Sequence, residues 1–311
     1  MSESRRVPGL LAIFVGVLVV VQSRINGQLS TDIGDGLLAA VISFGTGLVV
    51  VSVLLLVSRA NRDAVVHLPS LVRDRKLSWW MLIGGLGGAT LVAAQGIAVP
   101  MIGVALFTVS LVAGQTANGL FVDHVGLGPR GVAPVTVSRV VGSSLAVVAV
   151  VVAVSGRFGS ADFVVGLVLL VAFAGALIAA QQAVNGRVAA VTGRPIVAGF
   201  VNFVVGFSAL LVVWLVSGRH GVLLPLVAGK PWLYLGGPIG VIFIVVAAVI
   251  VRPLGVLLFG LLSVAGQLGG ALFVDRVFPT SGSTLSWQLV AGTILTFVGV
   301  AIAGRGSRNP A

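Results

Sequence analysis

The side chains in this sequence that could bind a polar molecule are mainly amides, and two pairs of them have helical spacing. Gln22 and Asn26 are four residues apart, as are Gln181 and Asn185, so each pair would share one face of a helix. The other residues that could contribute hydrogen bonds to the same kind of site are Thr90, Gln95, Gln115, Asn118, Asn202 and Gln267. An amide donates and accepts hydrogen bonds without carrying charge. This set therefore favours a binding site for a neutral or zwitterionic polar solute.

The segments that carry these amides are long and apolar. Of the 311 residues, 58% are hydrophobic and only 9% are charged, and the mean hydropathy is +1.16. A soluble domain has about 25% charged residues, so this composition indicates a protein that lies in lipid. It argues against a cytosolic enzyme and against a nucleic-acid-binding domain. The stretches that lack Asp, Glu, Lys and Arg are residues 7–23, 36–58, 77–122, 140–156, 163–186, 195–218, 231–251, 253–274 and 277–304.

These stretches have the length of membrane-spanning helices. A hydrocarbon core of about 30 Å is crossed by about 20 helical residues. Residues 77–122 are long enough for two crossings, and Gly96, Pro100 and Gly103 near the middle predict a helical hairpin. The sequence thus predicts an all-α integral membrane protein with ten transmembrane helices.

The second half of the chain repeats residues of the first half at nearly constant spacing. Gln22 and Asn26 recur 159 residues later as Gln181 and Asn185. The further pairs are Phe44 and Phe203, Gly47 and Gly206, Trp80 and Trp232, Gly84 and Gly236, Gly85 and Gly237, Gly88 and Gly240, Gly103 and Gly255, Gly114 and Gly266, Gln115 and Gln267, and Asp123 and Asp275. Membrane composition alone would not place amides and carboxylates in register, so we infer a duplication. With five helices in each copy, the second copy would be inverted relative to the first, as in many secondary transporters.

The predicted boundaries are residues 1–156 for the first five-helix repeat and residues 157–311 for the inverted second repeat. Most of the 19 Lys and Arg residues then lie on the side of the amino terminus. Basic residues concentrate on the cytoplasmic side of membrane proteins, so this bias predicts cytoplasmic amino and carboxyl termini. The net charge of +11 is explained by this topology rather than by a nucleic-acid partner. We expect a multi-pass protein of the bacterial inner membrane.

The duplicated pattern resembles the drug/metabolite transporter superfamily, and within it the YdcZ-like branch in its fused ten-helix form. The residues that carry the resemblance are Gln22–Gly27 and Gln181–Gly186, Gly84 and Gly85, and the block from Pro100 and Gly103 through Gly114 and Gln115 to Asp123, with its copy at Pro253, Gly255, Gly266, Gln267 and Asp275. The resemblance implies a small-molecule carrier, often an exporter, whose cavity is lined by helices one, three and four of each repeat. Some members of the superfamily carry a glutamate in the first helix as a proton site, and the first predicted span here has none.

Two acidic residues end predicted spans, and inversion would place them near opposite faces of the membrane. Asp123 and Asp275 could then not form a catalytic pair, because a proton-sharing pair needs carboxylates about 3 Å apart. We predict instead that Asp123 forms a structural ion pair with Arg139, in a fifth helix that begins near Val132. An anion-binding role for Arg139 is the alternative.

Glycines at one-turn spacing form a second recurring pattern. Gly84 and Gly88, like Gly236 and Gly240, would let a neighbouring helix approach closely, which predicts a role in helix packing. Each of the amides has a similar structural alternative. A hydrogen bond between membrane helices contributes about 0.6 kcal/mol on average, so a single amide could serve only to hold two helices together.

The remaining chemistry excludes several functional classes. The chain has no Cys, its three His lie outside or at the edges of the charge-free stretches, and it contains no phosphate-binding loop. We therefore expect no metal, no cofactor and no ATP-driven pumping. A nucleophile, a base and an orienting group are not found together, so we expect a protein that is not an enzyme.

The sequence as a whole predicts a secondary transporter of a small polar metabolite or related small molecule. It would work by alternating access, with efflux favoured over uptake. One alternative is a lipid-carrier flippase of related fold, with a headgroup site at Arg24 or Arg139. Another is a membrane scaffold that transports nothing. The expected partners are the small-molecule substrate and membrane lipids, with a homodimer as a possible assembly.

Overall fold

The computed structural model describes residues 3–129, 131–132, 134–155, 161–218, 230–254 and 256–305. Gly255, His220, the arginines at 130, 157, 219 and 308, and the expected boundary between residues 156 and 157 lie outside this part of the chain. The described residues form helices joined by turns and loops, with no strand among them. The helices are α1 (Glu3–Ile33), α2 (Gly36–Val57), α3 (Arg59–Val66), α4 (Leu68–Arg73), η1 (Trp79–Gly84), α5 (Gly85–His124), α6 (Val137–Ser155), α7 (Ala161–Thr192), α8 (Pro195–Val216), η3 (Pro231–Leu235), α9 (Gly236–Leu254), α10 (Val256–Val277) and α11 (Trp287–Arg305).

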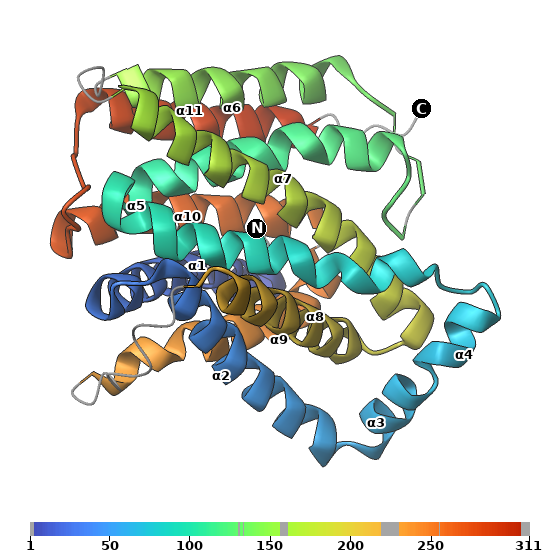
Figure 1. Cartoon of the computed structure of the whole chain (residues 1–311). Helices are drawn as coiled ribbons and strands as arrows, with labels where there is room; N and C mark the ends of the chain where they lie inside the picture. The colour runs from blue at the N-terminus through green and yellow to red at the C-terminus, as the bar shows by residue number, and fades with distance from the viewer. Residues whose placement is uncertain are drawn as a thin grey trace.

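The helices have the length and composition of membrane spans. Within the described residues, seven helical segments are long and apolar enough to cross a bilayer. The segment from Trp79 to His124 is the most enclosed of them, since 83% of its most apolar window is buried, against 33–39% for the other six. Helices α5, α6, α7, α10 and α11 lie on one side of the bundle, and α1, α2, α8 and α9 lie on the other (Figure 1). The all-helical membrane class predicted from the sequence is confirmed.

The long helix α5 is broken once, at Gly103. Its backbone there has φ 78° and ψ 165°, a conformation that side chains disfavour and glycine adopts freely. Helix α5 doubles back on itself between its two ends (Figure 1). Gly96 and Pro100 lie within the helical segment before the break, so only the third of the three residues noted in the sequence ends a helix. Pro100 removes one helical hydrogen bond without stopping the helix, whereas the positive φ of Gly103 does stop it.

Two faces of the bundle can be distinguished by the helix ends. The N-terminal face is the one where α1 begins and α2 ends. It also carries α3, α4 and a cluster in which Leu77 and Met81 pack with Val184, Val188 and Val197. The distal face is the one where α1 ends at Ile33, and it carries the ion pair between Lys230 Nζ and Asp32 Oδ2, at 2.8 Å.

Helix α6 begins later than the sequence suggests. It starts at Val137, five residues after the expected Val132. Gly131 has a positive φ of 75°, which lies outside right-handed helical geometry. Arg139 therefore lies in the first turn of α6.

Equivalent positions of the two halves make reciprocal contacts. A Cβ atom added to Gly16 in α1 would lie 2.0 Å from the carbonyl oxygen of Ser263 in α10. A Cβ added to Gly175 in α7, which is 159 residues further on, would lie 2.2 Å from the carbonyl oxygen of Leu111 in α5. Ser263 and Leu111 are themselves 152 residues apart, the second repeat spacing. The crossing of α1 with α10 is thus matched by the crossing of α7 with α5, and both need a glycine for backbone contact.

Helices α2 and α8, which are counterparts in the repeat, pack against each other at the centre. The rings of Phe44 and Phe203 have centroids 5.2 Å apart and planes inclined at 51°. This is a favourable geometry for two aromatic rings. Each ring lies on a glycine of the other half, Phe44 on Gly206 and Phe203 on Gly47. The two rings therefore form a reciprocal contact between the halves.

Candidate functional site

The first group of polar side chains joins α1 to the first segment of α5. Asn26 Nδ2 donates to Gln95 Oε1 at 2.7 Å, and Gln95 Nε2 donates to Ser23 Oγ at 2.9 Å. All three residues are buried, with 0%, 0% and 1% of their surface exposed. These hydrogen bonds fix the orientation of the Asn26 amide so that its oxygen points away from α5.

That oxygen faces the start of α9. A Cβ added to Gly236 would lie 2.2 Å from Asn26 Oδ1 and 2.8 Å from Ser43 Oγ of α2. Neither of these buried oxygen atoms has a hydrogen-bond partner in the structure. Gln22, one turn before Asn26, donates from Nε2 to the Gly236 carbonyl oxygen at 2.8 Å. We call Gln22, Ser23, Asn26, Ser43 and Gln95 the first amide cluster.

A second group of polar side chains lies where the repeat places the counterpart of the first. Gln181 and Asn185 of α7 and Asn202 of α8 correspond to Gln22, Asn26 and Ser43. They face the start of α5, where a Cβ added to Gly84 would lie 3.4 Å from Asn202 Oδ1 and 3.6 Å from Asn185 Oδ1. We call these three residues the second amide cluster.

The second cluster also contains polar atoms without partners. Gln181 Oε1 lies 3.3 Å from a Cβ added to Gly88, and this oxygen is buried and unpaired. The same is true of Asn202 Nδ2, in a residue that is 5% exposed. Most buried polar groups in proteins have a hydrogen-bond partner, so the unpaired atoms make both clusters candidate binding sites.

The aromatic pair lies between the two clusters. The Phe44 ring is 3.3 Å from a Cβ added to Gly88, on the second cluster, and the Phe203 ring is 3.6 Å from a Cβ added to Gly240, on the first. Each ring thus lies against a glycine that an amide of one cluster also faces. The glycines predicted to serve in helix packing, Gly84, Gly88, Gly236 and Gly240, are the surfaces that the amides face.

Four of the candidate residues are not linked to either cluster by the contacts of the described residues. Thr90 donates to the Leu86 carbonyl oxygen of its own helix at 2.9 Å. Asn118 Nδ2 donates to the Ala176 carbonyl oxygen of α7 at 2.7 Å, and Gln115 is half-buried one turn before it on α5. Gln267 Nε2 donates to Ser263 Oγ at 3.5 Å, while its buried Oε1 is unpaired.

Sequence reasoning missed the two serines of the first cluster. Ser23 and Ser43 are small hydroxyl residues in apolar helices, which are common and carry little signal by themselves. The repeat did contain the information for Ser43, because a spacing of 159 residues aligns it with Asn202. Ser23 aligns with Gln182, which is exposed, so no such signal existed for Ser23.

The two arginines Arg139 and Arg24, which lie in membrane spans, form their hydrogen bonds and ion pairs within the protein. Arg139 Nη2 forms an ion pair with Asp123 Oδ2, and Arg139 Nη1 donates to the Pro134 carbonyl oxygen. Arg24 donates from Nε to the Phe278 carbonyl oxygen at 3.0 Å and from Nη1 to Gln28 Oε1 at 2.9 Å. Both arginines therefore have structural partners.

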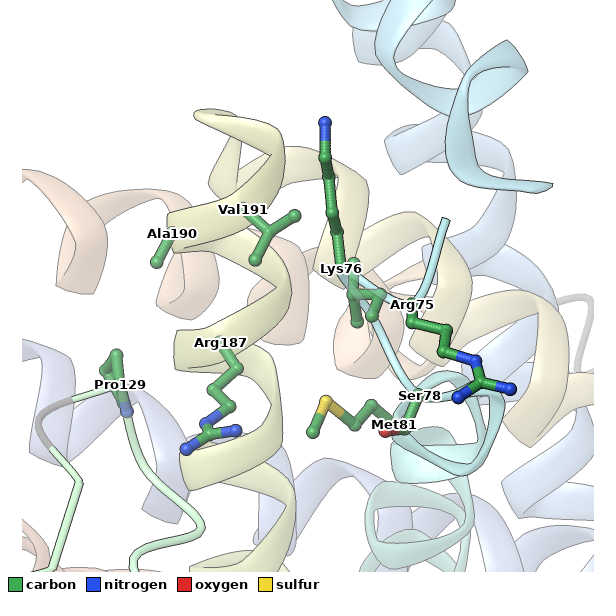
Figure 2. A pocket seen from close by; sticks show the side chains of 9 residues that line it. Arg75, Lys76, Ser78, Met81, Pro129, Arg187, Ala190 and Val191 are labelled. Atoms are coloured by element: carbon green, nitrogen blue, oxygen red, sulfur yellow. The ribbon is translucent and has the colours of Figure 1, made fainter. Parts of the chain in front are cut away.

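A pocket opens on the N-terminal face, one turn from the second amide cluster. Its volume is about 270 Å³, and its lining includes Met81, Pro129 and Arg187 together with Arg75 and Lys76. Arg187 lies between Pro129 and Met81, while the Lys76 side chain extends away from it (Figure 2). The Arg187 guanidinium donates to the carbonyl oxygens of Gly126 and Gly128 at 3.1 and 3.2 Å.

Comparison with protein families gives two matches along the chain. Residues 7–152 and residues 166–302 both match the family described as "Putative inner membrane exporter, YdcZ". The matches cover most of the chain, one in each half, as in a fused form of the family. No curated protein and no solved structure matches the chain.

Proposed function

Because the chain belongs to the YdcZ family of inner membrane exporters, we propose that it is a secondary transporter that moves a small polar metabolite out of the cytoplasm. The transporter works by alternating access between two inverted halves of five helices each. Membership of this family makes the chain a multi-pass protein of the inner membrane, and a carrier rather than an enzyme.

Reciprocal contacts support the inverted arrangement. Arg24 of α1 binds the loop after α10 at the distal face, through the Phe278 carbonyl oxygen. Arg187 of α7 binds the loop after α5 at the N-terminal face, through the Gly126 carbonyl oxygen, and Gly126 is 152 residues before Phe278. Corresponding loops therefore lie at opposite faces. In secondary transporters such copies exchange conformations around a central site.

The observation that carries the proposal is the set of unpaired polar atoms in the two amide clusters. Asn26 Oδ1, Ser43 Oγ and Gln181 Oε1 can accept hydrogen bonds, and Asn202 Nδ2 can donate them. Together they match a solute with both donors and acceptors, such as a polyol, an amide or a zwitterion. The absence of any acid from the clusters disfavours a cationic substrate. The glycines pack tightly on these amides, so the helices must separate before a solute can bind.

A screen of solutes against the purified protein tests the substrate class. A solute that binds only the folded protein, present at a concentration of about 100 times its Kd, raises the free energy of unfolding by about 2.7 kcal/mol. This increase shifts the melting temperature measurably. We expect polyols, amides or zwitterionic metabolites to raise the melting temperature of the wild type and not that of Asn26→Ala. Asn118→Ala, which removes an amide outside the clusters, is the matched control and should keep the shift. Equal shifts in wild type and Asn26→Ala would exclude the first amide cluster as the binding site.

The two rival functions make different predictions in the same screen. A lipid-carrier flippase would be stabilised by a polyprenyl phosphate and would need a free arginine, but Arg24 and Arg139 are both engaged by the protein. A scaffold would respond to none of the solutes. The unpaired amide atoms favour the transporter over both.

The proposed orientation places the N-terminal face in the cytoplasm. The chain has no Cys, so a single substitution supplies a unique thiol. Ala60 and Thr284 are exposed at the N-terminal and distal faces, respectively. In intact cells we expect a membrane-impermeant maleimide to label Thr284→Cys and not Ala60→Cys, with both labelled after permeabilisation. The reverse labelling pattern would show that the protein has the opposite orientation in the membrane.

A further inference from the structure

The distal face is closed around the break in α5 by a carboxylate from the other half of the chain. Asp275, near the end of α10, is 3% exposed. Its Oδ1 accepts from the Val104 backbone N–H at 2.9 Å, and its Oδ2 accepts from the Ala105 backbone N–H at 2.7 Å. Ser283 Oγ donates to the same carboxylate at 2.8 Å. Because the first amides of a helix lack partners within the helix, a carboxylate at this position stabilises it strongly.

The loop after α10 covers the same break from outside. Gly282 N and Ser281 Oγ donate to the Pro100 carbonyl oxygen at 3.0 and 3.1 Å. Thr280 Oγ1 donates to the Val99 carbonyl oxygen at 3.3 Å. A Cβ added to Gly282 would lie 2.1 Å from the Met101 carbonyl group, so loop and helix are in backbone contact. No solute can pass between them in this conformation.

The N-terminal face differs at the equivalent position. Asp123 is the counterpart of Asp275, but its side chain is 47% exposed and pairs with Arg139. The amides that correspond to those of Val104 and Ala105 belong to residues 256 and 257, at the start of α10. The pocket lined by Met81 and Arg187 opens on this same face. Among the described residues, the break in α5 is therefore covered at the distal face, whereas a pocket opens at the N-terminal face.

We propose that Asp275 and Asp123 are alternating latches of the transport cycle, an inference that rests on the function proposed above. In the conformation seen here, Asp275 closes the distal face by capping the second segment of α5. In the opposite conformation, Asp123 leaves Arg139 and caps the start of α10, which closes the N-terminal face, while Asp275 is released. Inverted halves exchange conformations, so a cap made by one half in one state is made by the other half in the next state.

Each released carboxylate has a cation close to it. Arg139 holds Asp123 in the present state. Arg24 donates to the carbonyl oxygen of Phe278, three residues after Asp275, so it is the cation that can pair with Asp275 when the latch opens. A charge near the membrane is costly without a partner. Each arginine therefore lowers the free energy of the conformation in which its carboxylate has left the helix that it caps. Arg139 has no basic counterpart, because the equivalent region of the second half holds Trp287 and Gln288, so the two faces are not identical in this respect.

The reactivity of two buried thiols tests the latch without any substrate. Val99 is 0% exposed, with its carbonyl oxygen bound by the distal loop and its side chain packed on Gly27 of α1, and Met81 lines the pocket on the N-terminal face. In purified protein we expect a water-soluble maleimide to react with the Met81→Cys thiol and not with the Val99→Cys thiol. Adding Asp275→Asn should raise the rate at Val99→Cys about tenfold, because hydrogen bonds to a charged group contribute enough to shift an equilibrium by that factor. The same variant should lower the rate at Met81→Cys.

Two further variants keep the test decisive. Ser283→Ala removes only one hydrogen bond to Asp275 and should shift both rates in the same directions by a smaller factor, which covers the case in which Asp275→Asn does not fold. Asp123→Asn should leave Val99→Cys protected. Continued protection of Val99→Cys in Asp275→Asn, or a rise in both rates together, would overturn the latch. Failure of the solute screen would count against the proposed substrate and leave these labelling results unaffected.

Discussion

Gly114→Ala is expected to destabilise the purified protein by about 1–3 kcal/mol, the usual cost of overpacking. A Cβ at this position would lie 1.9 Å from the carbonyl oxygen of Ala172, so the whole of α7 must move away from α5. The clash is with backbone and cannot be relieved by a change of side-chain rotamer. The effect is measured by thermal unfolding in detergent, with the loss of monodisperse protein as the readout.

The chain offers a control on the same helix and a copy in the other half. Gly119 has no atom within 4 Å of an added Cβ, so Gly119→Ala should cause no loss. Gly266, the counterpart of Gly114, would place a Cβ 2.0 Å from the Ile13 carbonyl oxygen, and Gly266→Ala should be about as harmful as Gly114→Ala. Equal losses at Gly114 and Gly119 would show that the close crossing of α5 and α7 is not what the glycine provides.

Gly236→Ala should abolish binding of the solute identified in the stabilisation screen while the protein stays folded. The added Cβ would overlap Asn26 Oδ1, at 2.2 Å, and Ser43 Oγ, at 2.8 Å. Both atoms are ends of side chains, so they can rotate away, but the Asn26 amide would then lose its hydrogen bond with Gln95. Loss of the solute-dependent rise in melting temperature, with a near-normal melting temperature in its absence, is the expected result.

Two neighbouring glycines separate a binding effect from a packing effect. Gly237→Ala would place a Cβ 2.0 Å from the Ser43 carbonyl oxygen and 2.3 Å from the Gly47 backbone nitrogen, so it should destabilise the protein itself. Gly84→Ala, the counterpart of Gly236→Ala, would meet nothing closer than 3.4 Å and should be tolerated. Solute binding that survives Gly236→Ala would show that the orientation of Asn26 set by the Gln95 hydrogen bond is not needed for binding.

The helical membrane class was predictable because it depends on composition and on the length of charge-free stretches. The positions at which the helices end were harder to predict from the sequence. Helix α1 continues to Ile33 although its charge-free stretch ends before Arg24, because Arg24 finds the Phe278 carbonyl oxygen and Asp32 finds Lys230. Partners that are distant in sequence allow charges to remain in a helix, and the local pattern does not contain them.

The chemical character of the candidate site was predictable from the sequence, but the set of residues that form it was harder to predict. The repeat identified Gln22, Asn26, Gln181 and Asn185, and the structure brings each pair into an amide cluster. Whether an amide on another helix joins them depends on the rotation of that helix about its axis. Gln95 points to Asn26, whereas Asn118 of the same α5 bonds to α7. Helix rotation is set by packing contacts such as those of Gly114, which the sequence reveals only as a glycine.

The paired rings of Phe44 and Phe203 have a consequence for the leakage of ions across the membrane. The tilted rings place apolar surface between a glycine that faces the first amide cluster and one that faces the second. Apolar contacts of this kind disfavour a continuous chain of water molecules. Leakage of protons through this contact would then be slow, which would help the membrane to keep its electrical potential.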